Sequence, residues 1–246
     1  MKVLMKQLSI QLKMDIRDKG TLMVFYLVPL GFFFVVGAVF SSVNPEIKPI
    51  LSAAMAIFSA TMGAVIGIPP SIVKMKESGV IRAYQASGIP MISVIISTGL
   101  GALIHLSIVS IALSLTAPIL YGAKIPKSIP GYVNVLLLLL VCSVSVGLLI
   151  GAAAKNTQTA TLLSQAVFMP SLMLSGIMFP AGLLPSPLRM IGNLFPATYA
   201  NQAFRGLAYG FDTDIAPHVS IAVILAVTIF ALALSIRYLG KVTRVR

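Results

Sequence analysis

Long stretches without a charged residue constrain this sequence more than any other feature. Six such intervals cover residues 21–44, 49–73, 83–123, 128–154, 156–188 and 215–236. A helix needs about 20 residues to cross roughly 30 Å of hydrocarbon, so each interval can hold one crossing. Only 10% of the 246 residues are charged, against about 25% in soluble domains. The sequence therefore predicts an all-α integral membrane protein with six transmembrane helices.

Proline, glycine and polar residues set the expected ends of these helices. We expect crossings over 21–41, 50–70, 91–117, 131–153, 157–178 and 216–236. The second should close at Pro69 and Pro70, because proline lacks the amide hydrogen that a helix interior uses. In the fourth, Ser143, Gly147 and Gly151 are spaced four apart. Such small residues let another helix approach closely, either within one subunit or between two.

Basic residues gather on one side of the membrane when the crossings are laid down in order. Most of the 18 lysines and arginines lie in the two terminal tails and in the connection between the second and third crossings. Positively charged loops favour the cytoplasm, so we expect a multi-pass protein of the cytoplasmic membrane with both termini inside the cell. The net charge of +12 sits beside membrane helices, where anionic headgroups account for it. We therefore expect this charge to face the lipid bilayer, and we do not expect nucleic acid as a partner.

Two further segments have a pattern of their own. Residues 1–20 alternate lysines with Leu4, Leu8, Leu12 and Ile16 at a spacing of four, which predicts an amphipathic helix lying in the membrane interface. A charged leader that only sets topology is the alternative. Residues 179–214 are too rich in proline and glycine for one helix, and predict two short helices near 186–194 and 198–208, with Thr198 as an N-cap.

The residues needed for catalysis, metal binding or ion coupling are not evident in the sequence. The six carboxylates, Asp15, Asp18, Glu46, Glu77, Asp212 and Asp214, lie outside the expected crossings. His105 is near the middle of a crossing, with no carboxylate expected beside it. We expect one interhelical hydrogen bond there, with proton sensing or substrate binding as the alternative. Neither a GxxxxGK[ST] phosphate loop nor a Gly-x-Ser-x-Gly turn is present. We therefore expect no enzyme, no catalytic or metal-binding residue and no bound cofactor, and any driving energy must come from another protein.

A charged segment, KMKESGVIRAYQASGIP at 74–90, separates the second and third crossings. Val80, Ile81 and Tyr84 occupy one side of a short helix expected to start near Ser78 and to end at Gly88. An apolar patch with a charged rim suits docking into a groove on a cytoplasmic partner. A solvated loop that only sets topology is the alternative.

Two motifs resemble the type-2 permeases of ATP-binding-cassette (ABC) transporters. Segment 76–90 resembles the intracellular segment after the second crossing of that family, at Glu77, Gly79, Arg82 and Pro90. The second motif resembles the family segment between the fifth and sixth crossings, at Gly176, Pro180, Leu184, Pro185, Leu188, Ile191, Pro196, Thr198, Tyr199 and Arg205. The resemblance covers the whole chain, including its length, its six crossings and its amphipathic leader.

This resemblance implies a single permease domain over 1–246 that works in an ATP-driven exporter. The partners would be two nucleotide-binding (ATPase) subunits, which hold ATP and Mg, and a second permease subunit, identical or different. Residues 1–20 would be a connecting helix, 74–90 a coupling helix docked on the ATPase, and 179–214 an outer re-entrant segment. The expected ATPase contacts are Glu77, Gly79, Val80, Ile81, Arg82 and Tyr84. The family often has a larger basic cluster where this chain has Val80 and Ile81.

The expected path for cargo is central, at the interface of a permease dimer, and is lined by residues of the second and fifth crossings. Its lining is apolar, aromatic or hydroxylic and has no fixed charge: Phe58, Ser59, Met62, Thr161, Gln165, Phe168 and Met169. Such a lining suits an amphipathic or lipophilic cargo, as in export of a drug, antibiotic or lipid and in multidrug resistance. The same residues could instead be ordinary helix packing. The alternative function is an ATP-independent channel or carrier for a neutral solute.

Overall fold

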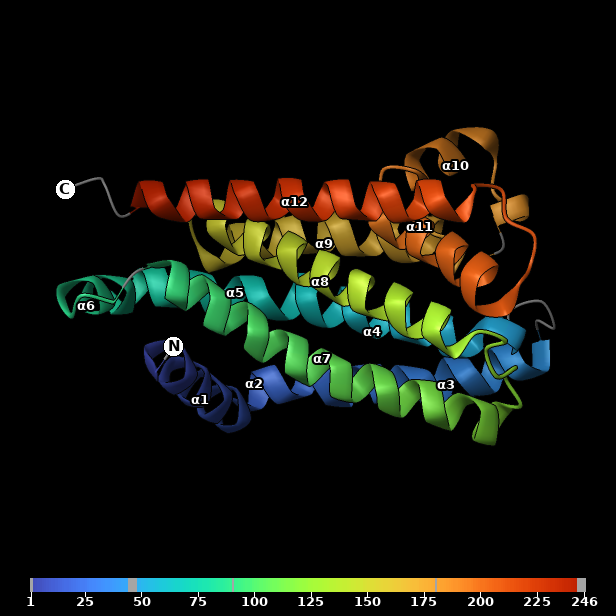
Figure 1. The fold of residues 1–246 in the computed structure, drawn as a ribbon, viewed down its shortest axis with the longest axis horizontal. Coiled ribbons are helices and arrows are strands. Elements are labelled where there is room, and N and C mark those ends of the chain that lie inside the picture. The colour runs from blue at the N-terminus through green and yellow to red at the C-terminus, as the bar shows by residue number, and fades with distance from the viewer. Residues whose placement is uncertain (1, 44–47, 90, 180, 243–246) are drawn as a thin grey trace.

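The computed structural model describes residues 2–43, 48–89, 91–179 and 181–242, and these residues form an elongated bundle of helices (Figure 1). The first half contains α1 (Lys2–Arg17), α2 (Lys19–Leu22), the π-helical turn η1 (Met23–Leu27), α3 (Val28–Val43), the short 3-10 helix η2 (Lys48–Ile50), α4 (Leu51–Met62), the π-helical turn η3 (Gly63–Gly67), α5 (Ile68–Glu77), α6 (Val80–Ala86) and α7 (Met91–Tyr121). The second half contains α8 (Ile129–Ala153), α9 (Thr157–Leu174), the 3-10 helix η4 (Ala181–Leu183), α10 (Ser186–Gly192), α11 (Pro196–Ala203), the π-helical turn η5 (Phe204–Tyr209) and α12 (Pro217–Val242). The all-α fold class is confirmed over this part of the chain.

Five helical stretches of the described residues are long and apolar enough to cross a membrane. They are Lys19–Val39, Lys48–Glu77, Ile92–Tyr121, Ile129–Ala153 and Pro217–Gly240. The expected fifth crossing, α9, is not among them, because it opens with the polar run TQTAT and ends at Leu174, short of the expected residue 178. It nevertheless packs within the bundle against α5, α8 and α11. A crossing by α9 therefore remains a prediction.

The core of the bundle is centred on α4, whose residues are all buried. Helices α3, α7, α8 and α11 surround it, and a helix that is apolar on every side is expected at such a position. The small-residue stripe of α8 lies against η3 and α5: a Cβ atom added to Gly147 would collide with the carbonyl of Ala64. Close packing within one chain therefore explains this stripe.

The prediction that Pro69 and Pro70 end the second crossing is wrong, because the helix continues to Glu77. The π-helical turn η3 lies directly before these prolines, which occupy the first turn of α5. Local π-helical adjustments let a continuous membrane helix tolerate proline, because they rearrange the backbone hydrogen bonds around the missing amide hydrogen. The expected segment 74–90 thus begins inside a helix. Pro29 likewise follows a π-helical turn, η1.

The two short helices expected within 179–214 are present as α10 and α11. Helix α11 is enclosed by α4, α8, α9 and α12, so it dips into the bundle instead of lying on its surface. The expected N-cap is wrong: α11 starts at Pro196 with Phe195 at the cap position. Thr198 instead donates its hydroxyl hydrogen to the carbonyl of Gly192 at 2.6 Å, joining α11 to the end of α10.

Candidate coupling site and transport path

Helix α6 forms a separate projection at one end of the bundle, beyond the ends of α5 and α7 (Figure 1). It begins at Val80, two residues after the expected Ser78. Glycines in the left-handed region bracket it, with φ of 75° at Gly79 and 72° at Gly88. After its last turn the amide of Ile89 donates to the carbonyl of Tyr84 at 2.9 Å, a bond typical of a glycine-terminated helix. Backbone geometry therefore fixes where this short helix starts and stops.

The predicted contact residues of α6 do not all face outward. Glu77 is exposed and Val80 is half-buried, whereas Ile81 is only 3% exposed and packs into the chain. Tyr84 is half-buried and lines a narrow cleft against α1 and α7. The side chain of Arg82 lies outside the described part of the structure. The accessible apolar surface is therefore smaller than the sequence suggests and is centred on Val80.

Lys76 fixes the end of α5 to the end of α8. Its ammonium group donates hydrogen bonds to the carbonyls of Gly151 at 2.7 Å, Ala152 at 2.6 Å and Ala154 at 3.1 Å. The last carbonyls of a helix have no partner within the helix and carry partial negative charge, so a cation there is favourable. Hydrogen bonds from a charged donor are also stronger than neutral ones. The sequence did not indicate this contact, because nothing in the spacing of Lys76 pointed to α8.

Glu77 makes a second connection, to the beginning of α9. Its carboxylate oxygen accepts a hydrogen bond from the hydroxyl of Thr157 at 3.4 Å. Asn156 caps the same helix end by accepting from the amide of Thr159 at 2.8 Å, and a carboxylate is favoured beside a helix N-terminus. The last turn of α5 therefore contacts both helices of the α8–α9 hairpin.

The predicted path residues fall into two groups. Phe58, Met62 and Phe168 meet in one buried cluster, with the rings of Phe58 and Phe168 5.9 Å apart. Phe32 also stacks on Phe58, with the two ring centroids 4.0 Å apart. The gap beside Phe58 and Phe168 is too small for a water molecule. Ser59 faces away from this cluster, with its hydroxyl 3.2 Å from that of Ser110 on α7.

The remaining path residues lie on the opposite, exposed face of α9. Thr161, Gln165 and Met169 are exposed there together with Met173. Ala160, Ser164, Phe168 and Ser171 form the buried face of the same helix. The single chain therefore brings three of the seven path residues together, and leaves three others on a surface.

His105 has two partners. The sequence predicted a hydrogen bond to another helix without naming the residue, and it did not predict the second partner, a carboxylate. Its Nδ1 atom lies 2.7 Å from the Tyr26 hydroxyl, which is the expected interhelical hydrogen bond. Its Nε2 atom lies 3.6 Å from a carboxylate oxygen of Asp15, and Asp15 also accepts from Gln11 at 2.8 Å. The expectation that no carboxylate is near His105 is wrong. Helix α1 packs on α7 with Gln7 buried and with Gln11 and Asp15 half-buried, while Lys6 and Lys13 are exposed.

Comparison with known proteins identifies the class to which this helical membrane protein belongs. A family model described as "ABC-2 type transporter" matches residues 5–209, which is most of the chain. The chain belongs to the ABC-2 type transporter family and is a multi-pass membrane protein.

A named relative supports the same assignment. The chain is similar to ABC transporter G family member 20 of Dictyostelium discoideum, with 29% identity over 173 residues. The match covers 69% of this chain and 23% of the relative. The chain thus spans about a quarter of the length of the curated relative that it matches.

Proposed function

We propose that this chain is the permease subunit of an ATP-driven exporter in the cytoplasmic membrane. It crosses the membrane six times with both termini in the cytoplasm, pairs with a second permease subunit and takes its energy from separate ATPase subunits. ATP and Mg are held by those subunits. Membership of the ABC-2 family supports this proposal, as do the five apolar helices of the described residues.

The observation that carries the proposal is the connection of α6 to the bundle. Only Ser78 and Gly79 separate α6 from the end of α5. That end is bonded to α8 through Lys76 and to α9 through Glu77. A force applied to α6 by an ATPase would therefore reach both helices of the α8–α9 hairpin.

The cargo that fits this permease best is amphipathic or lipophilic, such as a drug, an antibiotic or a lipid. The exposed face of α9 carries Met169, Met173, Gln165 and Thr161, and the buried cluster beside it contains Phe58 and Phe168. Aromatic and methionine side chains adapt to apolar surfaces of varied shape, and a few polar groups fix orientation. In a dimer, the α9 faces of two subunits would line a central path.

Substitutions at the end of α5 and on α6 test the proposed coupling. We expect Glu77→Gln and Val80→Asp to reduce ATPase stimulation and co-purification of the ATPase subunit without affecting membrane insertion. Arg237→Gln, at an exposed position of α12, is the matched control and should behave as wild type. Normal transport by both the Glu77→Gln and the Val80→Asp variants would count against the coupling role.

The alternative is an ATP-independent channel or carrier for a neutral solute. Reconstitution of the purified chain alone distinguishes the two functions. Flux without ATP or an ATPase subunit would favour the alternative, whereas the proposed exporter should be inactive until its partner is added.

A further inference from the structure

A buried ionisable pair joins α1 to the middle of α7. His105 lies within a stretch long and apolar enough to cross a membrane and is only 4% exposed. Its Nε2 atom makes no hydrogen bond with a described residue, and a carboxylate oxygen of Asp15 lies 3.6 Å from it. This distance is too long for a hydrogen bond but short enough for an ion pair. The strength of the contact therefore depends on the charge of the ring.

The surroundings of His105 match a protonated ring. Its Nδ1 atom lies 2.7 Å from the Tyr26 hydroxyl, so an oxygen atom faces each ring nitrogen. A neutral imidazole has one N–H donor, whereas a protonated imidazole has two and can donate to Tyr26 and Asp15 together. Gln11 orients the carboxylate by donating to it at 2.8 Å. Gly101, one turn before His105, leaves room for Asp15, because an added Cβ atom would lie 3.3 Å from the carboxylate.

Asp15 is the charged group that faces His105 among the described residues. Helices α3 and α4 and the turn η3 pack on α7 and contain no titratable residue. Other titratable residues on the elements packed against α7 are exposed, lie towards an end of the bundle or bond elsewhere: Lys6, Lys13 and Arg17 on α1, Tyr84 on α6, Tyr132 and Cys142 on α8, and His218, Arg237 and Tyr238 on α12. The protonation of His105 is therefore governed mainly by Asp15.

An open cavity gives protons access to the pair. It has a volume of about 520 Å³ and lies between the α1–α2 corner and α5, so it is large enough for water. Two cations and two carboxylates line it, Arg17, Lys74, Asp15 and Asp18, and their formal charges balance. Water in this cavity can exchange a proton with the pair, because Asp15 borders the cavity and also contacts the ring.

We propose that Asp15 and His105 form a proton-operated latch that holds α1 on α7. Uptake of one proton from water by the His105 ring converts a loose contact into an ion pair between imidazolium and carboxylate, and return of that proton to water opens it. Docked α1 brings a negative charge to the ring and so favours its protonated form. By linkage, protonation favours docking, and α1 is held less firmly as pH rises.

The latch also affects the support of α6. Gln7 and Gln11 of α1 line the same narrow cleft as Tyr84 of α6. Release of α1 therefore removes one wall against which α6 rests. This consequence for ATPase coupling rests on the proposed function, whereas the proton dependence of α1 docking does not.

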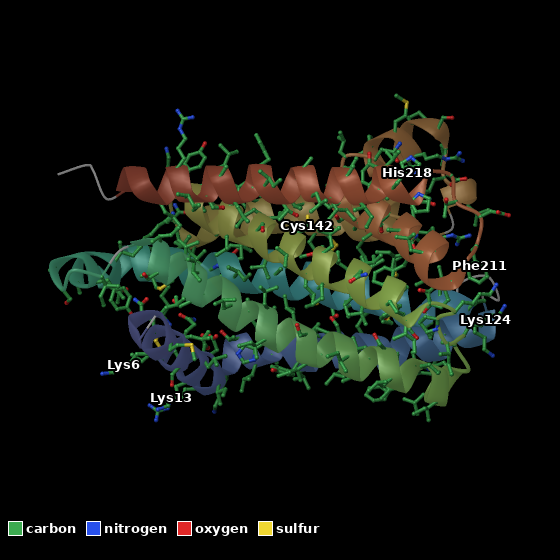
Figure 2. All side chains as sticks on the ribbon, viewed as in Figure 1. Lys6, Lys13, Lys124, Cys142, Phe211 and His218 are labelled. Carbon is green, nitrogen blue, oxygen red and sulfur yellow. The ribbon has the colours of Figure 1, made fainter. Side chains whose placement is uncertain are left out.

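Distances between two spin labels test the latch in the purified full-length chain in nanodiscs. The labels are attached at Lys13→Cys on α1 and Lys155→Cys after α8, both exposed positions, in a Cys142→Ala background. Lys13 points away from the bundle (Figure 2), so its label does not disturb the contact. The ratio of docked to undocked α1 should fall about fivefold or more between about pH 5.5 and about pH 8.5, the range in which histidine ordinarily changes charge.

Three substitutions show which groups cause the pH dependence. Asp15→Asn and His105→Gln should each remove it, because either change leaves no ion pair to form. His218→Gln is the matched control, since His218 is the other of the two histidines and is exposed; it should keep the full change. Persistence of the pH dependence in Asp15→Asn, or its loss in His218→Gln, would overturn the latch.

NMR of ¹⁵N-labelled histidine rings gives an independent readout. In the His218→Gln variant the remaining histidine signal belongs to His105. Its ring should carry a proton on both nitrogens at about pH 5.5 and on one nitrogen at about pH 8.5, and the change should follow the docking of α1. A ring that stays neutral over this range would overturn the proposal. Neither readout involves the ATPase, so failure here is distinguishable from failure of the proposed exporter function.

Discussion

Lys76 shows how one side chain can join two membrane helices at their ends. Its charged group satisfies three carbonyls at the end of α8 that would otherwise lack partners in a half-buried position. Sequence spacing could not reveal this contact, because Lys76 and Gly151 are 75 positions apart and each is unremarkable in its own segment. Asp15 and His105 were missed for the same reason.

We predict that Lys76→Met destabilises the protein by about 1.5–3 kcal/mol, the usual range for hydrogen bonds to a charged group. The methionine keeps the length and apolar stem of lysine but removes the donors. Thermal unfolding in detergent measures the loss. Lys155→Met, at an exposed position, should leave the transition temperature unchanged; equal effects of both substitutions would contradict the capping role.

The Asp15–His105 contact should hold α1 against α7. We predict that Asp15→Asn increases hydrogen exchange throughout α1, because the amide keeps the shape of the side chain but loses the charge that faces His105. Unfolding measurements on Asp15→Asn, His105→Gln and the double variant should give a coupling energy of about 0.5–3 kcal/mol, as for residues in direct contact. Additive effects would show that the two residues act independently.

At the scale of elements, the features set by local sequence patterns were predictable, whereas those set by long-range packing were not. The amphipathic leader forms α1, the two glycines bracket α6, and two short helices follow α9. Each depends on residues close together in sequence. The continuation of the second crossing through Pro69 and Pro70 was not predictable, because it depends on the π-helical turn η3 and on the packing of α8 against that turn.

Close approach of α8 to η3 predicts different effects at two glycines. Gly147→Ala should destabilise the protein by about 1–3 kcal/mol, the usual range for overpacking, since the new methyl group meets the carbonyl of Ala64. Gly182 has no atom within 4 Å of an added Cβ, so Gly182→Ala should be neutral. Thermal unfolding of the two variants side by side checks this, and a neutral result at Gly147 would rule out the tight packing.

At the scale of the whole molecule, the cargo path is only partly present in one chain. Phe58, Met62 and Phe168 are sealed inside the bundle, whereas Gln165 and Met169 lie on a surface. The residue types could suggest which side chains line a path. They could not show which of those on α9 are buried and which are exposed, because this depends on the orientation of the helix about its axis against α4 and α5.

The proposed topology predicts opposite labelling of two exposed lysine positions at the two ends of the bundle. Lys13 is on α1 and Lys124 follows α7 (Figure 2). In a Cys142→Ala background, which removes the buried cysteine, Lys13→Cys should react with an impermeant thiol reagent only from the cytoplasmic side. Lys124→Cys should react only from the other side. Labelling of both from one side would contradict the odd number of crossings, three, that the proposed topology places between them.

The central claim is that α6 receives force from a separate ATPase. The most direct test is disulfide or thiol-specific cross-linking from Val80→Cys in the Cys142→Ala background. It is combined with uphill transport assays on the same reconstituted complex. We predict that position 80 cross-links to the ATPase subunit and that uphill flux needs ATP and that subunit. Uphill flux by the chain alone, or an assembled complex in which α6 contacts no ATPase, would contradict the account.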